Sequence, residues 1–517
     1  MCDGFLIARQ SGLAALAGLF TLVGMACGEV VDSALPDGSP APEDVDGDGN
    51  VASPAADAAS ACPEGFTGEE CDECTIFVSD ASGDNSNAGL SWNDALKTVN
   101  RGISRAAIRI DNEDLEHCSV WVREGVYVPG SARTDSFELQ PHVHIFGGFA
   151  GFESSRNERD WEEYRTILSG ELATDGDNAY QVVMGADEAV LDGFTVTDGV
   201  ADGGENQGGG IVNDSVSPEV RNTHFYNNLA SRGGAAHNLG DSRPVFVNVM
   251  FSHNAAENRG GAIYNEDKSR PELRNVSVLE NDSGQFGGGV YSVGDSKPLL
   301  TNVAFKDNTA DTSGGGLYNG ASSETTVINA VFSGNEAGSG AGVENTVTSR
   351  PVFVNATFSQ NVAAGNGGAM RNSFSADVEI INGILWGNTA DGDNEIHDDG
   401  SSLLISHTIV QGGPPDTADT TEPVLASNPH FVGAPPVGVM NGIDADERVG
   451  IAPAFLDDLS DDLHLLESSP AIDVGDTSVT QMDGFPDVDL VGNPRVVVGD
   501  SDGDEPEIDM GAFEFQP

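Results

Sequence analysis

The sequence predicts an all-β solenoid, a coil in which each turn is one copy of a repeated segment. Seven copies of one pattern, among them PVFVNVMFSHN and PELRNVSVLEN, recur between Val220 and Asn388 at steps of 26 or 27 residues. A glycine-rich motif such as GGAIYN lies between consecutive copies. Apolar residues within each copy alternate as in a half-buried strand and do not follow helical spacing. One copy cannot bury its apolar face alone, so the copies must stack.

Stacking of the copies predicts files of like side chains along the coil. Each copy carries one apolar residue before a central asparagine and another after it, and Phe251, Val278 and Phe305 belong to the second set. If each copy is one turn, these side chains lie above one another about 4.8 Å apart, the spacing of neighbouring strands. The glycines fit the corners between strands, where the backbone needs positive φ or a close approach.

The central asparagines are expected to form a column of their own. They are Asn222, Asn248, Asn275, Asn302, Asn329, Asn355 and Asn382. Stacked amides can hydrogen-bond along such a column and satisfy bent backbone, which favours a structural role. A row of ligand contacts is the alternative.

The repeat resembles the right-handed parallel β-helix, a single-stranded solenoid of the pectate-lyase type. More narrowly, it is similar to the F-x-x-N and G-G-A-I passenger repeats of polymorphic outer-membrane proteins, a family of bacterial surface adhesins. Phe251-Ser-His-Asn254 followed by Gly260-Gly-Ala-Ile263 is the clearest pair. The resemblance implies regular β-helix turns over residues 208–412. It indicates fold more specifically than function.

Residues 1–26 are predicted to be an export signal. One basic residue, Arg9, precedes an apolar stretch, Leu13–Ala26, that is too short to span a bilayer permanently. The stretch ends in LVGMAC, which resembles a bacterial lipobox. This resemblance implies a lipid on Cys27, the cell envelope as a partner, and an outer-membrane or cell-surface location. Cleavage after Ala26 without lipid is the alternative, which predicts an extracellular protein.

Residues 27–61 are expected to form a disordered acidic tether. They are rich in Asp, Pro, Ala and Gly and carry almost no large apolar side chains, so they cannot offset their ordering entropy. Asp44, Asp46 and Asp48 begin like a calcium loop, but its twelfth position is Ala55, where an EF-hand has glutamate. This difference favours a solvated linker over a calcium site.

Residues 62–74 resemble the end of a laminin-type EGF module, in the pattern CPEGFTGEECDEC. Export would place the chain in an oxidising compartment, where an even set of four cysteines indicates disulfides. The resemblance implies a bond between Cys62 and Cys71, which leaves Cys74 and Cys118 for each other.

Residues 75–207 are expected to open the coil with a cap and irregular turns. Ser91-Trp-Asn-Asp94 has the shape of a capping box, and the apolar residues that follow have helical spacing. We therefore predict an amphipathic helix over Trp92–Ile110 that closes the exposed apolar end of the strands. The motifs SWNDA, GGFAGF and RDW resemble the N-terminal region of secreted bacterial β-helix-repeat proteins. His142 and His144 could share a strand face and bind metal, but ordinary histidines are favoured because no third ligand accompanies them.

The C-terminal part leaves the regular pattern after Ile405–Gln411, the predicted final turn. Residues 413–462 are rich in Pro, Asp and Gly and are expected to form a loop. Residues 463–517, with motifs such as SSPAIDVGD and GNPR, resemble the choice-of-anchor domain of bacterial surface β-helix proteins. We expect this part to cap the last open turn. Its aspartates could hold calcium but are favoured as turn caps; they are Asp473, Asp476, Asp487, Asp489 and Asp509.

The charge of the chain limits its partners. It carries 83 acidic and 23 basic residues, a net charge of −60 at pH 7. Such a field excludes nucleic acid as a partner and repels anionic lipid headgroups. Divalent cations fit it better, and calcium is the one cofactor we consider. Few lysines and many aspartates discourage edge-to-edge association, so we expect a monomer.

Two functions remain open. The first is an exported, lipid-anchored surface protein that acts as an adhesin or envelope component and binds carbohydrate or a neighbouring surface. The second is a polysaccharide lyase or glycoside hydrolase, whose chemistry needs clustered carboxylates. We name no catalytic residue, because no carboxylate cluster repeats at strand positions in adjacent turns. His224, His237 and His253, near one end of the repeat, are the best indication of a site.

Overall fold

The computed structural model describes residues 74–172, 177–202 and 207–429 and part of the C-terminal region. In that region the described residues are 463, 465, 469–472, 474–482, 484–486, 488–490 and 508–513. The predicted signal, the tether and most of the 413–462 loop lie outside these residues. So do Cys27, Cys62, Cys71, Asp44, Asp46, Asp48, Asp473 and Asp487.

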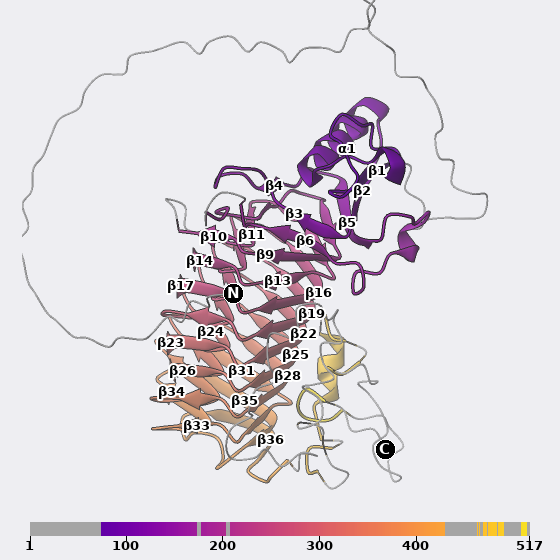
Figure 1. The fold of residues 1–517 in the computed structure, drawn as a ribbon. Helices are drawn as coiled ribbons and strands as arrows, with labels where there is room; N and C mark the ends of the chain where they lie inside the picture. The colour runs from indigo at the N-terminus through magenta and orange to yellow at the C-terminus, as the bar shows by residue number, and fades with distance from the viewer. Residues whose placement is uncertain are drawn as a thin grey trace, which may run out of the picture. The chain divides into compact units, whose positions relative to one another are not determined.

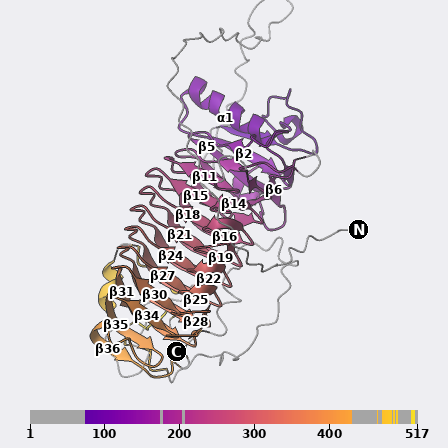
Figure 2. The same ribbon diagram turned by 90° about the vertical axis from the view of Figure 1, so that its left-hand side faces the viewer.

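Three parallel sheets run along one column, and a regular turn contributes one strand to each (Figures 1 and 2). In one such turn the chain passes through β16 (Val245–Ser252), β17 (Ala255–Arg259) and β18 (Ile263–Asn265), and then starts the next turn at β19 (Glu272–Leu279). We call the sheets of 18, 8 and 10 strands the main, second and third sheets.

The main sheet contains, besides β16 and β19, the longest strands of the repeat and the irregular N-terminal turns. Its other strands are β1 (Thr75–Val78), β2 (Cys118–Arg123), β3 (Gly125–Tyr127), β5 (Val143–Phe149), β6 (Thr166–Ser169), β8 (Val190–Asp192), β9 (Phe194–Thr197), β12 (Glu219–Arg221), β13 (His224–Tyr226), β22 (Leu299–Lys306), β25 (Thr326–Ser333), β28 (Val352–Ser359), β31 (Asp377–Ile381), β32 (Ile384–Trp386), β35 (Ser402–Val410) and β36 (Asp419–Leu425).

The second and third sheets consist of shorter strands. The second contains β10 (Val200–Ala201), β14 (Leu229–Arg232), β17, β20 (Asp282–Ser283), β23 (Thr309–Ser313), β26 (Glu336–Ser339), β29 (Val362–Ala363) and β33 (Thr389–Ala390). The third contains β4 (Phe137–Glu138), β7 (Val183–Met184), β11 (Ile211–Asp214), β15 (Ala236–Leu239), β18, β21 (Val290–Ser292), β24 (Leu317–Asn319), β27 (Val343–Asn345), β30 (Met370–Ser373) and β34 (Ile396–Asp399).

The interior of the coil is built from files of like side chains. Phe251 lies opposite Val278, and Val278 lies opposite Phe305, and all three are fully buried. The file continues with stacked rings, because the centroids of Phe305 and Phe332 lie 4.6 Å apart and their planes are nearly parallel. The predicted interior file is therefore confirmed.

The central asparagines have φ between 46° and 58°; five lie within β16, β19, β22, β25 and β28, whereas Asn222 and Asn382 lie between two strands of the main sheet. Their amides bond from turn to turn: Asn248 Nδ2 donates to Asn222 Oδ1 at 3.2 Å, and Asn275 Nδ2 donates to Asn248 Oδ1 at 3.2 Å. Further bonds of this kind join Asn302 to Asn275, Asn329 to Asn302 and Asn382 to Asn355. We call this set the outer asparagine row.

A second asparagine file, whose role the sequence did not indicate, lies inside the corner between the main and second sheets. Its members are Asn228, Asn254, Asn281, Asn308, Asn335, Asn361 and Asn388, each at most 3% exposed. Asn281 is typical: its Nδ2 donates to Phe251 O at 2.9 Å and to Asn308 Oδ1 at 2.9 Å, and its backbone N–H also donates to Asn308 Oδ1. Each amide therefore satisfies backbone and side-chain groups where the strand ladder is interrupted.

A third file of asparagines runs along the third sheet, with one serine among its members. It runs through Asn213, Asn238, Asn265, Ser292, Asn319, Asn345 and Asn372. Asn265 Nδ2 donates to Ser292 Oγ at 3.2 Å, so the hydroxyl takes the place of an amide acceptor.

The N-terminal end is closed by α1 (Val99–Glu113), but the helix begins later than predicted. Trp92–Asp94 forms a separate 3-10 turn (η1), and Ser91 makes no capping hydrogen bond. The reason is Leu96, which is fully buried and exchanges backbone hydrogen bonds with β1 instead of continuing a helix. Thr98 caps α1 by accepting from the backbone N–H of Arg101.

The helix packs closely on the first strands. Val99, Ile103 and Ala106 are buried on its inner face. Gly102 permits the close approach, because a Cβ added there would lie 2.6 Å from Val78 Cγ2. Cys74 and Cys118 form a disulfide that joins the residue before β1 to the first residue of β2.

The C-terminal region differs from the expectation in two ways. The coil extends past residue 412, because β36 pairs in parallel with β35. The described residues of 463–517, which include the 3-10 helix η4 (Thr477–Gln481), pack along the side of the main sheet, whereas we expected them to cover the end of the coil. The apolar outward side chains of that sheet account for this placement. The remaining 3-10 helix is η2 (Arg156–Glu158).

We predict that the buried asparagine file stabilises the fold more than the third file does. Asn281→Ala removes the donor to Phe251 O and the acceptor of the Asn254 backbone N–H, which should cost about 3 kcal/mol of unfolding free energy. Asn265→Ser should cost less than about 1 kcal/mol, because Ser292 already occupies that position in the next turn. Urea denaturation of both variants measures the difference. Equal losses would show that the two files have the same energetic role.

Candidate functional site

The outward side of the main sheet is accessible in its earlier turns and covered in its later turns. One row of facing positions runs through Arg221, Val247, Arg274, Thr301, Ile328 and Val354. Its later members are covered: Ile328 and Val354 are fully buried against Val479 and Ile508 of the C-terminal region. Its earlier members remain accessible, and the Arg274 side chain is 54% exposed.

A neighbouring row shows the same transition. Val331 and Ile384 are buried in a cluster with Met510 and Phe513, whereas Met250, nearer the N-terminus, is half-buried. Figure 1 shows the C-terminal region, in yellow, beside the strands that follow β19. We call the accessible part, defined by Arg221, His224, Val247, Met250 and Arg274, the open face.

Two of the three histidines singled out from the sequence meet at the open face. His224 Nε2 lies 2.7 Å from Ser252 Oγ, and His253 Nε2 lies 2.9 Å from Glu280 Oε2. The Tyr226 ring lies beside both imidazoles, with centroids 5.5 Å from that of His224 and 5.4 Å from that of His253. This cluster is polar and lies on the sheet that the open face belongs to.

Burial, with His253 and Arg165 nearby, lowers the pKa of the His224 imidazole to about 4. His224 is therefore neutral at physiological pH and can act as a hydrogen-bond acceptor or donor. His237, the third of the histidines, lies on β15 in the third sheet, where its Nε2 is 3.1 Å from Glu266 Oε1. The structure separates it from the other two.

A loop fixed by a buried ion pair borders the open face on its N-terminal side. Arg159 and Asp192 side chains are 8% and 6% exposed and approach to 2.8 Å. The Arg159 guanidinium also lies 4.9 Å from the Trp161 ring and 5.1 Å from the Phe146 ring. Asp192 Oδ1 accepts a hydrogen bond from Asn222 Nδ2, which ties this loop to the outer asparagine row. The GGFAGF and RDW motifs thus meet in a structural cluster.

The third sheet carries an aromatic row on its outer side. Tyr264, Tyr291 and Tyr318 stack with centroids 5.2 Å and 4.7 Å apart. Arg232 lies over Tyr264 at 5.8 Å and Arg259 over Tyr291 at 5.5 Å. Tyr264 and Tyr291 are only 2% and 6% exposed, so their ring faces contact one another and the guanidinium groups. We interpret this row as packing, because the ring faces are not accessible to a ligand.

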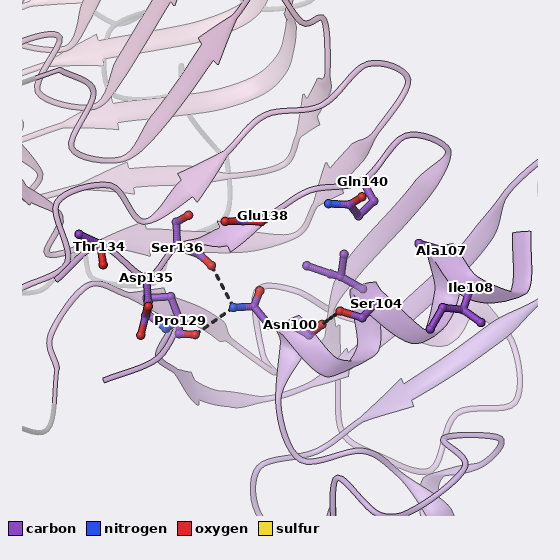
Figure 3. Close-up of a pocket in the computed structure, with 11 residues that line it drawn as sticks. Asn100, Ser104, Ala107, Ile108, Pro129, Thr134, Asp135, Ser136, Glu138 and Gln140 are labelled. Carbon is purple, nitrogen blue, oxygen red and sulfur yellow. Dashed lines mark hydrogen bonds between the residues drawn. The ribbon is translucent and has the colours of Figure 1, made fainter. Parts of the chain in front are cut away.

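A cavity of about 530 Å³ lies between α1 and the segment at residues 129–140 (Figure 3). Asn100 holds the segment by donating to Pro129 O and Ser136 O, both at 2.9 Å. The apolar wall includes Ile103 and Ile108, and carboxylates stand at the other side. One of them, Asp135, accepts backbone N–H groups of its own turn. The size suits a small ligand. The hydrogen bonds of Asn100 and Asp135, however, stabilise the segment at residues 129–140.

Among the described residues, the buried carboxyl groups of Glu344 and Glu395 have strongly altered acidity. Burial raises the pKa of Glu344 to about 7, against the opposing effect of Arg371, whose Nη1 lies 2.6 Å away. Burial also raises the pKa of Glu395 to about 7, against hydrogen bonds from Asn388. Glu344 and Glu395 are 2% and 5% exposed, so neither carboxyl group faces a ligand at the surface.

The aspartates and histidines considered as metal ligands have other contacts where the structure describes them. Within the described ranges no group of three His, Cys, Asp or Glu side chains could hold a metal ion. Asp476 accepts from the backbone N–H of Ser478 and caps η4, while Asp489 and Asp509 are buried. His142 lies before β5 and pairs with Glu188, whereas His144 stacks on His117. Calcium binding by the aspartates outside the described residues stays a prediction.

Comparison with known proteins establishes the fold. Residues 104–358 match the family model described as the right-handed beta helix region. The coil is a right-handed parallel β-helix. No curated protein matches the sequence. In the part of the chain that the structure describes, no helix has the length and apolar character needed to cross a membrane.

Three solved structures are similar to this β-helix in fold. Pectate lyase Pel9A is 13% identical, with 86% of this chain and 97% of that chain covered and a TM-score of 0.47. PfbA, a surface adhesin of Streptococcus pneumoniae, is 12% identical, with 63% and 84% covered and a TM-score of 0.32. GH136 lacto-N-biosidase from Eubacterium ramulus is 10% identical, with 63% and 68% covered and a TM-score of 0.28.

We predict that Glu395 makes the β-helix less stable as pH rises. The unfolded carboxyl group ionises near pH 4.5 and the folded one near pH 7, so the folded state binds more protons between these values. The contribution of Glu395 to the free energy of unfolding is therefore complete below about pH 4.5 and is lost as the pH rises through about 7. Glu395→Gln, which can still accept from Asn388, should remove the loss and raise stability near pH 8 by about 3 kcal/mol at most.

Urea denaturation of the wild type and Glu395→Gln at about pH 5 and about pH 8 checks this. The two proteins should differ little at the lower pH and clearly at the higher one. A difference that is independent of pH would mean that the buried carboxyl group ionises normally.

Proposed function

We propose that this β-helix is an exported, lipid-anchored cell-surface protein that recognises an extended polymer, carbohydrate or a neighbouring surface, through its open face. One observation carries the proposal. The same sheet face is covered by the protein's own C-terminal region over its later turns and left accessible over β12, β13, β16 and β19. The side chains change with it, from Ile328 and Val354 where it is covered to Arg221 and Arg274 where it is accessible.

The composition of the open face suits recognition. Arg221 and Arg274 side chains are 42% and 54% exposed and pair with Glu219 and Glu272 on their own strands. Exposed guanidinium groups, with half-buried imidazoles and apolar side chains beside them, can hydrogen-bond and pack against a polar polymer. The rigid β-helix holds these groups at a fixed spacing, which lowers the ordering cost of binding.

Glycoside hydrolysis, one of the two enzymatic alternatives, needs an accessible acid and a second carboxylate beside the scissile bond. The two carboxyl groups whose pKa lies near neutrality, Glu344 and Glu395, are buried and bond to Arg371 and Asn388. Burial inside the β-helix explains their raised pKa values. We therefore favour recognition over glycoside hydrolysis.

Anchoring is tested through Cys27. Labelled palmitate should be incorporated into the intact chain expressed in a bacterial host and should be absent from Cys27→Ala. Cys2→Ala, which lies before the predicted cleavage site, serves as the matched control and should keep the label. Label retained in Cys27→Ala would contradict the lipid anchor and leave the fold unaffected.

Recognition is tested with a panel of acidic and neutral polysaccharides and with intact bacterial cells. We expect at least one to bind, and Met250→Glu to weaken binding roughly tenfold or more by placing a charge in the contact. Val362→Glu makes the same change on the second sheet, at a side chain 45% exposed, and should bind normally. Shortened saccharide products in the same assay would favour the enzyme instead.

A further inference from the structure

The outer asparagine row already binds polypeptide within this molecule. Asn382 Nδ2 donates to the backbone carbonyl of Asp476 at 3.3 Å, and Asn382 Oδ1 accepts from the backbone N–H of Asp476 at 2.6 Å. Asn329 Nδ2 also lies 3.4 Å from the carbonyl oxygen of Val488. The C-terminal region is thus held by amide-to-backbone hydrogen bonds as well as by apolar contacts.

The hydrogen bonds to the C-terminal region use the amide N–H that is not bonded to the neighbouring asparagine of the row. An asparagine amide has two N–H groups. In Asn382 one bond goes to Asn355 Oδ1 at 3.1 Å and the other to the docked backbone. Asn329 follows the same arrangement, with one bond to Asn302 Oδ1 and one to Val488. One donor therefore maintains the row and the second binds a carbonyl group.

The same amides continue into the open face with the second donor unused. Asn248 and Asn275 have φ of 53°, close to the 58° of Asn329 and the 55° of Asn382, so the strand presents them in the same way. Each donates to the preceding asparagine of the row. Neither has another hydrogen-bond acceptor among the described residues, and Asn275 is exposed while Asn248 is half-buried.

Apolar contacts also continue beside these amides. Val247 and Met250 face outward from β16 and are half-buried, at positions equivalent to Ile328 and Val331 of the covered turns. A partner that occupies the open face would thus find the two kinds of contact that hold the C-terminal region, at consecutive turns of the same sheet.

We propose that the open face binds a polypeptide segment of a partner protein. Its backbone carbonyls accept from the second amide N–H groups of Asn248 and Asn275, and its apolar side chains pack on Val247 and Met250. This deepens the proposed function by naming its ligand class, and it rests on the open face being the recognition surface. A polypeptide is favoured over a polysaccharide because Asn329 and Asn382, two and four turns beyond Asn275 in the same row, bind backbone carbonyls.

The test uses the full-length folded protein and a phage-displayed library of random short peptides. Sequences that bind the wild type should share apolar residues. Their binding should fall roughly tenfold or more in the double variant Asn248→Asp/Asn275→Asp, which loses the donors but keeps side chains that tolerate positive φ. Met250→Glu should have the same effect without altering the asparagine row, and Val362→Glu should have none.

Circular dichroism of each variant establishes that loss of binding is not loss of folding. A library that yields no binder, or binders indifferent to both the asparagine and the Met250 substitutions, would overturn the proposal. The panel of polysaccharides and cells distinguishes failure of the polypeptide ligand from failure of the recognition function itself. Binding there that depends on Met250, with no peptide binding, would leave the recognition function standing and remove the polypeptide ligand.

Discussion

Hydrogen bonds between consecutive turns hold this β-helix together, because a single turn leaves most of its backbone N–H and C=O groups unpaired. Along the strands the neighbouring turns satisfy these groups directly, in parallel register from β1 to β36. At corners and bulges the strand ladder is interrupted. There the asparagine files supply amide donors and acceptors, and this requirement explains why the repeat keeps an asparagine at fixed positions while its apolar residues vary.

Aligned amides also need a partner at the end of each file. In the outer row the last donor, Asn222 Nδ2, meets the carboxylate of Asp192 at 2.8 Å. In the buried file the last donor, Asn388 Nδ2, meets Glu395 Oε2 at 2.6 Å. The two files run in opposite directions, and both end on the acceptor oxygen of an acidic side chain. Asp192 is in turn held by Arg159, so the N-terminal loop, the outer row and the open face form one connected structure.

The division of the main sheet into covered and accessible parts gives the molecule its candidate site. The covered part shows which chemistry this face can bind, since the C-terminal region docks there through backbone hydrogen bonds and apolar side chains. The accessible part keeps the amides and adds arginine and histidine beside the apolar Val247 and Met250. Recognition at this face therefore requires no chemistry that the β-helix does not already use on itself.

The sequence by itself determined the repeat, the interior files and the parallel strands, because a period of 26 or 27 residues places like side chains above one another. It also indicated His224 and His253, through their neighbouring positions in adjacent copies. It did not show that Leu96 delays the helix, since that depends on backbone hydrogen bonds with β1. Nor did it show which outward residues are covered, because the residues that cover them are distant in sequence, by 159 residues for Asn329 and Val488 and by 94 for Asn382 and Asp476. Contacts within a turn and between neighbouring turns follow from the period, whereas contacts across the chain are decided by tertiary packing.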